Sequence, residues 1–143
     1  MLSVKSIEET YRFYTNVLGF LPGAAMPGPD GKMAHGEVSF GTTHLMFGRI
    51  DQAGMDPALA KTSYTENTKK GAVGGGIVLY FNLGFGSVDQ YFKAVRERGG
   101  KTVTEPETKW WGDRAFSIAD PDGYLLTFCE TVAEFDPSKM PKK

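Results

Sequence analysis

Two histidines and a glutamate lie close together in the sequence and could perform acid–base or metal chemistry. His35 and Glu37 are two residues apart on a predicted strand, so their side chains share one face. His44 begins the next predicted strand, across a short hairpin. The three side chains could bind a metal ion together only if their faces agree. The alternative is a polar strand face with a hydrogen-bonded pair, and both interpretations stay open.

A pair of tryptophans is suited to ligand binding rather than to catalysis. Trp110 and Trp111 adjoin just before a predicted strand, and aromatic faces stack on planar or cationic ligands. The alternative is that one tryptophan fills the core or a dimer interface. Arg114 follows and could bind a ligand carboxylate, or could form an ion pair with Asp113 or Glu107.

Composition narrows the possible classes of protein. The chain has 143 residues and a net charge of -1, without the basic excess that is typical of nucleic-acid binders. No apolar run approaches the roughly 20 residues of a membrane span. Cys129 is the single cysteine, so no internal disulfide can form, and it reads as a small buried apolar side chain. The start of the sequence lacks a signal-peptide pattern, so a cytoplasmic protein is expected.

The elements that must position these residues follow from periodicity. Apolar residues at helical spacing predict helices over 6–18 and 87–98, each opened by a capping box (Ser6 with Glu9, Ser87 with Gln90). A short helix is expected around 57–61. Short segments rich in β-forming residues, bounded by turns, predict strands at 2–4, 32–40, 43–50, 77–83, 101–104, 115–119 and 124–130.

The predicted elements occur in two similar sets. The first helix (6–19) aligns with the second (87–100), and the hairpin segment 39–47 aligns with 119–127. The sequence therefore predicts an α+β fold built from two βαβββ modules. Their expected bounds are 1–50 for the first module, 51–75 for a linker, 76–131 for the second module and 132–143 for a tail.

Four segments carry a resemblance to a known family. They are RFYTNVLGF (12–20), MPGPDGKMAHGEVSFG (26–41), DQYFKAVRERGGKT (89–102) and WGDRAFSIADPDGYLLTF (111–128). In this order the chain resembles the vicinal oxygen chelate superfamily, which includes glyoxalase I, extradiol dioxygenases and bleomycin-resistance proteins. The MPGPDGKMAHGEV stretch is similar to the PhnB-like branch. The resemblance implies that both modules form one cupped mixed β-sheet around a pocket, and that the protein is a homodimer.

The resemblance also names the places where a metal would bind. Enzymes of the family hold a divalent ion with His, Gln or Glu from the first and last strands of each module. The matching positions here lie just upstream of Val4, near Phe47, near Val78 and at Thr127, and none carries such a ligand. We therefore expect no metal and no other cofactor. Should the usual ligands be misplaced, Fe, Ni or Zn would be expected, and His35, Glu37 and His44 form the fallback set.

The remaining expectation is an apolar pocket. On the family template five side chains face it, with core packing as the alternative: Phe47, Val78, Tyr80, Leu125 and Thr127. Trp110, Trp111 and Arg114 would lie at its rim, and His35 and Glu37 are the candidate catalytic residues. Binding of a small hydrophobic or aromatic molecule, as in antibiotic-sequestering proteins, is therefore favoured over catalysis. A metal-dependent lyase, isomerase or dioxygenase is the alternative, and a non-catalytic subunit is the third possibility. Neither nucleic acid nor membrane is expected as a partner.

Overall fold

The computed structural model describes residues 1–53, 57–84 and 86–140. The chain divides into two compact units. Unit 1 comprises Met1–Gly76 together with the turn Asp120–Tyr124, and unit 2 comprises Ile77–Ala119 and Leu125–Lys143. Among the described residues, no helix combines the length and apolar character needed to cross a membrane.

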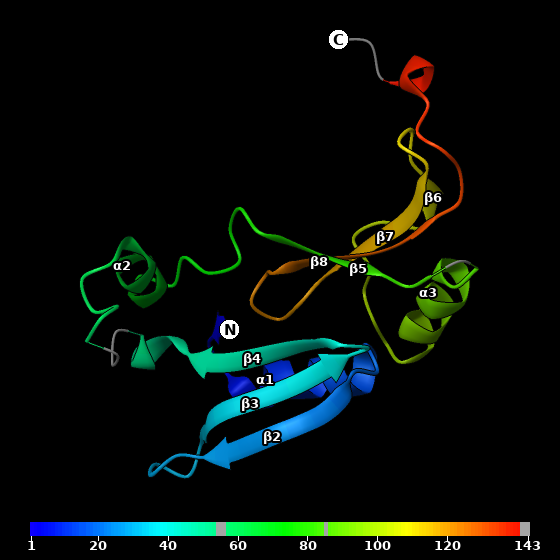
Figure 1. Ribbon diagram of the computed structural model, residues 1–143. Helices are drawn as coiled ribbons and strands as arrows, with labels where there is room; N and C mark the ends of the chain where they lie inside the picture. The colour runs from blue at the N-terminus through cyan, green and yellow to red at the C-terminus, as the bar shows by residue number, and fades with distance from the viewer. Residues whose placement is uncertain (54–56, 85, 141–143) are drawn as a thin grey trace. The chain divides into compact units, whose positions relative to one another are not determined.

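Unit 1 contains a four-stranded sheet with the order β1-β4-β3-β2, called sheet 1 below. β1 runs parallel to β4, and the other neighbours are antiparallel. Figure 1 shows β2, β3 and β4 side by side, with α1 behind them. The elements are β1 (Leu2–Val4), α1 (Ile7–Arg12), the π-helical turn η1 (Phe13–Val17), β2 (Leu21–Pro27), β3 (Met33–Phe40) and β4 (Thr43–Arg49).

The first helix forms where the sequence predicts it. The Ser6 side chain accepts a hydrogen bond from the Glu9 backbone N–H at 3.2 Å, which satisfies one of the free donors at the helix start. The helix continues into η1, and Gly19 follows with a φ of 74°, a left-handed conformation that glycine adopts without strain. The stripe that the helix buries, which includes Ile7 and Tyr14, forms the core with sheet 1.

The segment between the two sheets carries a short 3-10 turn, η2 (Ile50–Gln52), and a helix, α2 (Ser63–Lys69). The helix expected around 57–61 is wrong, because those residues form turns. The helix in this segment, α2, begins at Ser63, because Thr62 is the residue that caps it. Its side chain accepts a hydrogen bond from the Thr65 backbone N–H at 3.4 Å.

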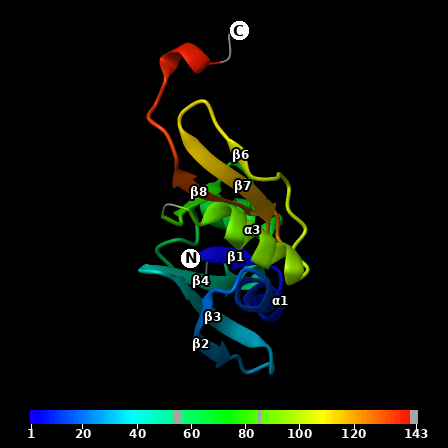
Figure 2. The same cartoon turned by 90° about the vertical axis from the view of Figure 1, so that its right-hand side faces the viewer.

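Unit 2 contains a second four-stranded sheet with the order β5-β8-β7-β6, called sheet 2. β5 runs parallel to β8, and the other pairs are antiparallel. Figure 2 shows this sheet with its helix α3 alongside. The elements are β5 (Val78–Asn82), α3 (Val88–Glu97), β6 (Glu107–Thr108), β7 (Asp113–Ala119), β8 (Leu125–Thr131) and the 3-10 turn η3 (Pro137–Lys139).

Two local expectations for unit 2 are wrong. Segment 101–104 forms no strand. It makes one isolated bridge between Thr102 and Ile118, and the edge strand β6 follows further on. Ser87 makes no side-chain capping bond to α3. The Glu130 carboxylate takes that role because it reaches the helix start from β8 and accepts hydrogen bonds from three backbone N–H groups there, those of Gly86, Ser87 and Val88.

The two sheets repeat one topology. Each unit follows the order strand, helix and three strands, and each places its first strand parallel to its last. The predicted fold class, α+β with two βαβββ modules, is confirmed. The register of the repeat differs by one residue from the sequence alignment in the hairpin. Phe47 packs against Tyr14 and Phe128 packs against Tyr91 of α3, so Phe47 corresponds in its face to Phe128 rather than to Thr127.

The predicted turn at 120–123 forms and becomes part of unit 1. The Gly123 backbone N–H donates to the Asp120 carbonyl at 3.0 Å. Asp120 Oδ1 accepts hydrogen bonds from the backbone N–H groups of Asp122 and Tyr124, and Oδ2 accepts one from the Tyr14 hydroxyl at 3.1 Å. Burial raises the pKa of the Asp120 carboxyl above its ordinary value. This aspartate therefore has a structural role in joining the turn to the first helix.

Candidate functional site

Each sheet packs one face against the helix that follows its first strand, α1 or α3, and that helix leaves the other face uncovered. On sheet 1 the helix face is marked by Gly36, where an added Cβ would lie 2.8 Å from Ile7 Cγ2. Because side chains alternate along a strand, the opposite face of β3 carries His35 and Glu37. The cross-strand partners of these two residues on β4 are Gly48 and Met46. We call this opposite face the open face of sheet 1.

The three candidate acid–base residues agree in their faces. His44 pairs with Ser39, two residues along β3 from Glu37, so it lies on the open face as well. His44 Nδ1 lies 3.2 Å from Glu37 Oε1. However, within the described ranges no group of three His, Cys, Asp or Glu side chains is placed to hold a metal ion. The contact in this set joins Glu37 to His44, whereas the alternative from the sequence was a pair of Glu37 with His35.

A hollow of about 230 Å³ lies beside this face in unit 1. Residues of the segment between the sheets close one side of it. The Tyr64 hydroxyl of α2 lies 2.6 Å from Ser3 Oγ of β1, which joins the segment to the sheet. Apolar side chains alternate with a few polar groups, as is typical of small-molecule sites. The lining residues are Met1, Ser3, Ala34, His35, Gly48, Arg49, Gln52, Ala53, Leu59 and Tyr64.

A second hollow of about 330 Å³ lies near the start of α1 and is more polar. Arg49 lines both hollows. Its guanidinium donates to Asp30 Oδ2 at 2.6 Å and forms a two-pronged ion pair with Asp51. These hydrogen bonds hold the pKa of both carboxyls below the ordinary value. Because two carboxylates already neutralise its charge, Arg49 is poorly suited to bind an anionic ligand.

Sheet 2 brings four of the five predicted pocket residues onto one face. Val78 pairs with Leu125 and Tyr80 pairs with Thr127 across β5 and β8, so the four share the face opposite α3. Tyr80 is 60% exposed and Val78 is 45% exposed, although both are large apolar side chains on a strand. Thr127 is buried beside them, with its Oγ1 2.9 Å from Ser117 Oγ. We call this the open face of sheet 2.

Phe47, the fifth predicted pocket residue, lies elsewhere. It is fully buried on the helix face of sheet 1, where its ring centroid is 5.1 Å from that of Tyr14. The one-residue shift in register explains this placement, since a strand residue and its neighbour point to opposite faces. Core packing, the alternative that the sequence left open, describes Phe47.

The tryptophan pair lies on the connection between β6 and β7. Trp111 Nε1 donates to Asp113 Oδ2 at 3.0 Å, and by strand alternation Asp113 shares its side of β7 with Ser117 on the open face. Trp110 packs edge-on against Trp111 and contacts the ring of Phe135 near the C-terminus. Trp111 thus lies at one end of the open face of sheet 2, and Trp110 lies between it and the C-terminal segment.

Arg114 points to the opposite side of β7. Its guanidinium donates two hydrogen bonds to the Asp89 carboxylate of α3, each 2.7 Å long. These bonds hold the pKa of the Asp89 carboxyl below its ordinary value. Ion pairing, one of the two predicted roles, is therefore present, but with a helix residue instead of Asp113 or Glu107. Cys129 is buried as expected, and burial raises the pKa of its thiol, which disfavours the nucleophilic thiolate.

Sequence reasoning missed the residues that the connecting segment adds to the hollow. Gln52, Leu59 and Tyr64 line it, yet the sequence identified 51–75 only as a linker. The signal that could have found them is the unusual length of this segment, because long connections in compact domains are often functional. Met46 was missed as well, because the alignment placed Phe47 on the face that Met46 occupies.

Comparisons with known proteins agree with this fold. Residues 1–128 match the family model described as the glyoxalase/bleomycin resistance protein/dioxygenase superfamily. Uncharacterized proteins of Mycobacterium bovis and Mycobacterium tuberculosis (strain H37Rv) are 28% identical over 129 residues. The matches cover 90% of this chain and 78% and 70% of those proteins, respectively.

Solved structures show the same architecture. A family enzyme from Burkholderia phytofirmans superposes with a TM-score of 0.67 at 17% identity, covering 92% of this chain and 94% of that one. A glyoxalase/bleomycin resistance protein/dioxygenase from Nocardioides gives a TM-score of 0.66 at 19% identity, covering 98% and 85%. With two βαβββ modules and a family match over most of its length, the chain belongs to the glyoxalase/bleomycin resistance protein/dioxygenase superfamily.

Proposed function

We propose that this protein binds a small hydrophobic or aromatic molecule on the open faces of its sheets, without the divalent metal centre of the family's enzymes. The observation that carries the proposal is the open face of sheet 2. Val78 and Tyr80 are exposed there on a strand, beside the paired hydroxyls of Thr127 and Ser117. Exposed apolar groups with a few fixed polar groups are what a small-molecule site requires. The hollow beside sheet 1 supports the same proposal.

We further propose that the protein belongs to the PhnB-like branch, that it forms a cytoplasmic homodimer and that it sequesters toxic molecules such as antibiotics. Similarity to the relatives does not decide these points, because proteins that share a fold often differ in function, which depends on the residues of the site. Analytical ultracentrifugation tests the dimer directly, with a mass of two chains expected.

A binding screen tests the proposal. Metal-free protein is screened by thermal shift against small aromatic compounds, and affinities of hits are measured by equilibrium dialysis. Tyr80→Ala should weaken binding by roughly tenfold, because an aromatic contact with its buried area is worth about 1.4 kcal/mol. Val103→Ala is the matched control, since Val103 is as exposed as Tyr80 but lies outside the strands, on the connection between α3 and β6. Equal affinities for Tyr80→Ala and wild type would contradict the proposal.

A metal-dependent lyase, isomerase or dioxygenase is the second candidate function. One observation favours it, namely the shared face of His35, Glu37 and His44 on sheet 1. Elemental analysis of protein offered Ni(II), Zn(II) and Fe(II) separates the two candidates. The leading proposal predicts a stoichiometry near zero. A stoichiometry near one ion per chain, lost in Glu37→Gln, would favour the enzyme.

A further inference from the structure

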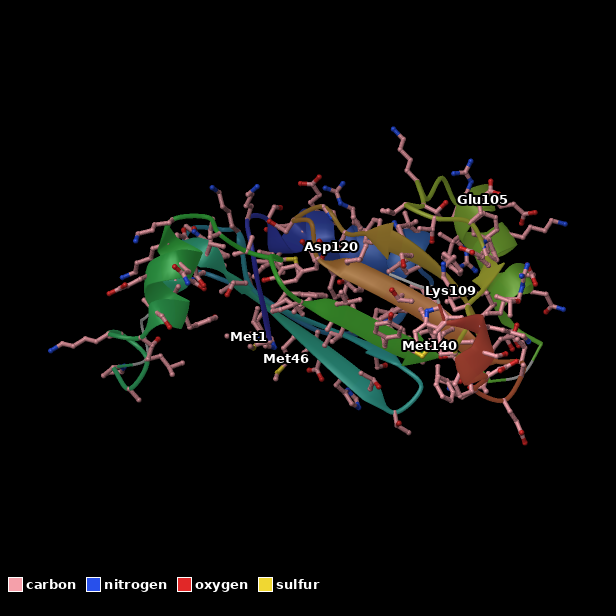
Figure 3. The ribbon with its side chains drawn as sticks, turned by 90° about the horizontal axis from the view of Figure 1, so that it is seen from above. Met1, Met46, Glu105, Lys109, Asp120 and Met140 are labelled. Carbon is pink, nitrogen blue, oxygen red and sulfur yellow. The ribbon has the colours of Figure 1, made fainter. Side chains whose placement is uncertain are left out.

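Three exposed methionines gather around the histidine of the open face of sheet 1. The parallel register that pairs Leu2 with Phe47 places Met1 beside Met46, and Figure 3 shows these two side chains close together. Met26 of β2 pairs with His35. Met1, Met46 and Met26 are 67%, 43% and 53% exposed. Methionine is an apolar side chain, so three exposed thioethers around one imidazole call for a physical explanation.

Met1 and His35 both lie beside Gly48. An added Cβ at Gly48 would lie 3.1 Å from Met1 Sδ, so the thioether lies directly over this glycine. Gly48 is also the cross-strand partner of His35, and Met1 and His35 line the same hollow. Because Gly48 has no side chain, the Met1 thioether can lie over this position, next to His35, the cross-strand partner of Gly48.

This donor set has a distinct chemical preference. Thioether sulfur is a soft ligand that selects monovalent copper, and imidazole binds copper as well. Divalent ions of the harder kind need carboxylates, but the nearest one on this face, that of Glu37, is in contact with His44. A soft, neutral donor set of this kind differs from the His, Gln and Glu ligands that the family's enzymes use.

We propose that the open face of sheet 1 binds Cu(I) through Met1 Sδ and the His35 imidazole, which line the hollow beside it, with Met46 of the same face as the third ligand. The site goes beyond the proposed function and can exist with or without a small-molecule ligand. Ligand exchange alone is involved, because the ion enters and leaves as Cu(I) and no electron is transferred.

A competition experiment tests the site. The full chain is titrated with Cu(I) under anaerobic, reducing conditions against a chromogenic Cu(I) chelator. His35→Gln should weaken Cu(I) binding by at least about tenfold, since even outer partners of metal ligands are worth 10–100-fold. Met46→Leu, which preserves volume, should weaken it by a smaller factor. The matched control Met140→Leu should leave the affinity unchanged. An unchanged affinity in His35→Gln would overturn the proposal.

A second readout identifies the sulfur ligands without a substitution at Met1. The protein is labelled with 13C at the methionine methyl groups and titrated with Ag(I), a redox-inert substitute for Cu(I). The methyl signals of Met1 and Met46 should shift in a saturable way, while that of the exposed Met140 stays in place. Equal shifts at Met140 would show non-specific thioether binding and would overturn the site. Small-molecule binding is measured on metal-free protein, so its failure and failure of this site remain distinguishable.

Discussion

The two sheets share one topology but differ in what their two faces carry. On the helix faces, Phe47 and Phe128 occupy corresponding places on the last strands, and both are fully buried. On the open faces, sheet 1 presents imidazole, carboxylate and thioether groups, whereas sheet 2 presents aromatic, aliphatic and hydroxyl groups. The comparison indicates that the helix-facing residues maintain the fold, while the opposite faces are free to differ in chemistry.

The largest expected effect distinguishes the two cores. Gly36 and Phe116 occupy corresponding places, each paired with the buried phenylalanine of its sheet's last strand. Phe116→Ala should lower the free energy of unfolding by about 3–5 kcal/mol, because a fully buried ring leaves a cavity. Gly36→Ala should cost about 1–3 kcal/mol by overpacking against Ile7. Urea denaturation measures both. A smaller loss of stability for Phe116→Ala than for Gly36→Ala would contradict the roles given to these two core positions.

The two helix starts provide the next comparison. α1 is capped locally by Ser6, whereas α3 is capped by the buried carboxylate of Glu130 from β8. Ser6→Ala should cost about 1 kcal/mol. Glu130→Ala should cost about 2–3 kcal/mol, because it leaves three backbone donors without their acceptor.

Hydrogen exchange locates these effects. The amides at the start of α3 should lose protection in Glu130→Ala and keep part of it in Glu130→Gln, which retains one acceptor oxygen. If protection fell equally in all helices and strands, with no extra loss at the start of α3, the result would contradict the capping role.

The smallest expected effect is a pH dependence that belongs to unit 1 alone. Burial raises the folded-state pKa of Asp120 above the value of 3.8 expected in the unfolded chain. The folded state therefore retains this proton longer as pH rises. The stabilising contribution of Asp120 is greatest below pH 3.8 and decreases as pH rises through the folded-state pKa.

A matched variant isolates this contribution. The stability difference between wild type and Asp120→Asn should decrease from acid to neutral pH, as measured by urea denaturation at a series of pH values. A difference that grows with pH would mean that the carboxylate is stabilised in its charged form by the hydrogen bonds from Tyr14 and Tyr124.

Much of the fold could be predicted from the sequence because its signals are local. The helix at 6–18 and the turn at 120–123 follow from a cap, a stripe and turn residues that act on their immediate neighbours. The repeat also predicted the fold class. What failed depends on partners distant in sequence. The Glu130 cap of α3 and the Asp89 partner of Arg114 come from other elements, and no local pattern identifies them.

The candidate site was less predictable because strand faces alternate. Val78, Tyr80, Leu125 and Thr127 were grouped correctly, since they pair across one parallel strand pair. Phe47 was assigned to the wrong face because an alignment error of one residue reverses the face of a strand side chain. The same error concealed Met46. Tyr64 could not be placed, because its contact with Ser3 is formed only when the connecting segment folds over the sheet.

The most direct test of the account is to map a bound ligand on the backbone. The tightest aromatic compound from the screen is titrated into 15N-labelled, metal-free protein, and amide shifts are followed to saturation. We predict that the largest shifts fall on one open face, at positions such as Tyr80 and Thr127 of sheet 2 or His35 of sheet 1, with small shifts along α1 and α3. Shifts concentrated on the helices, or a screen that yields no saturable ligand, would contradict the claim that the open faces are binding surfaces.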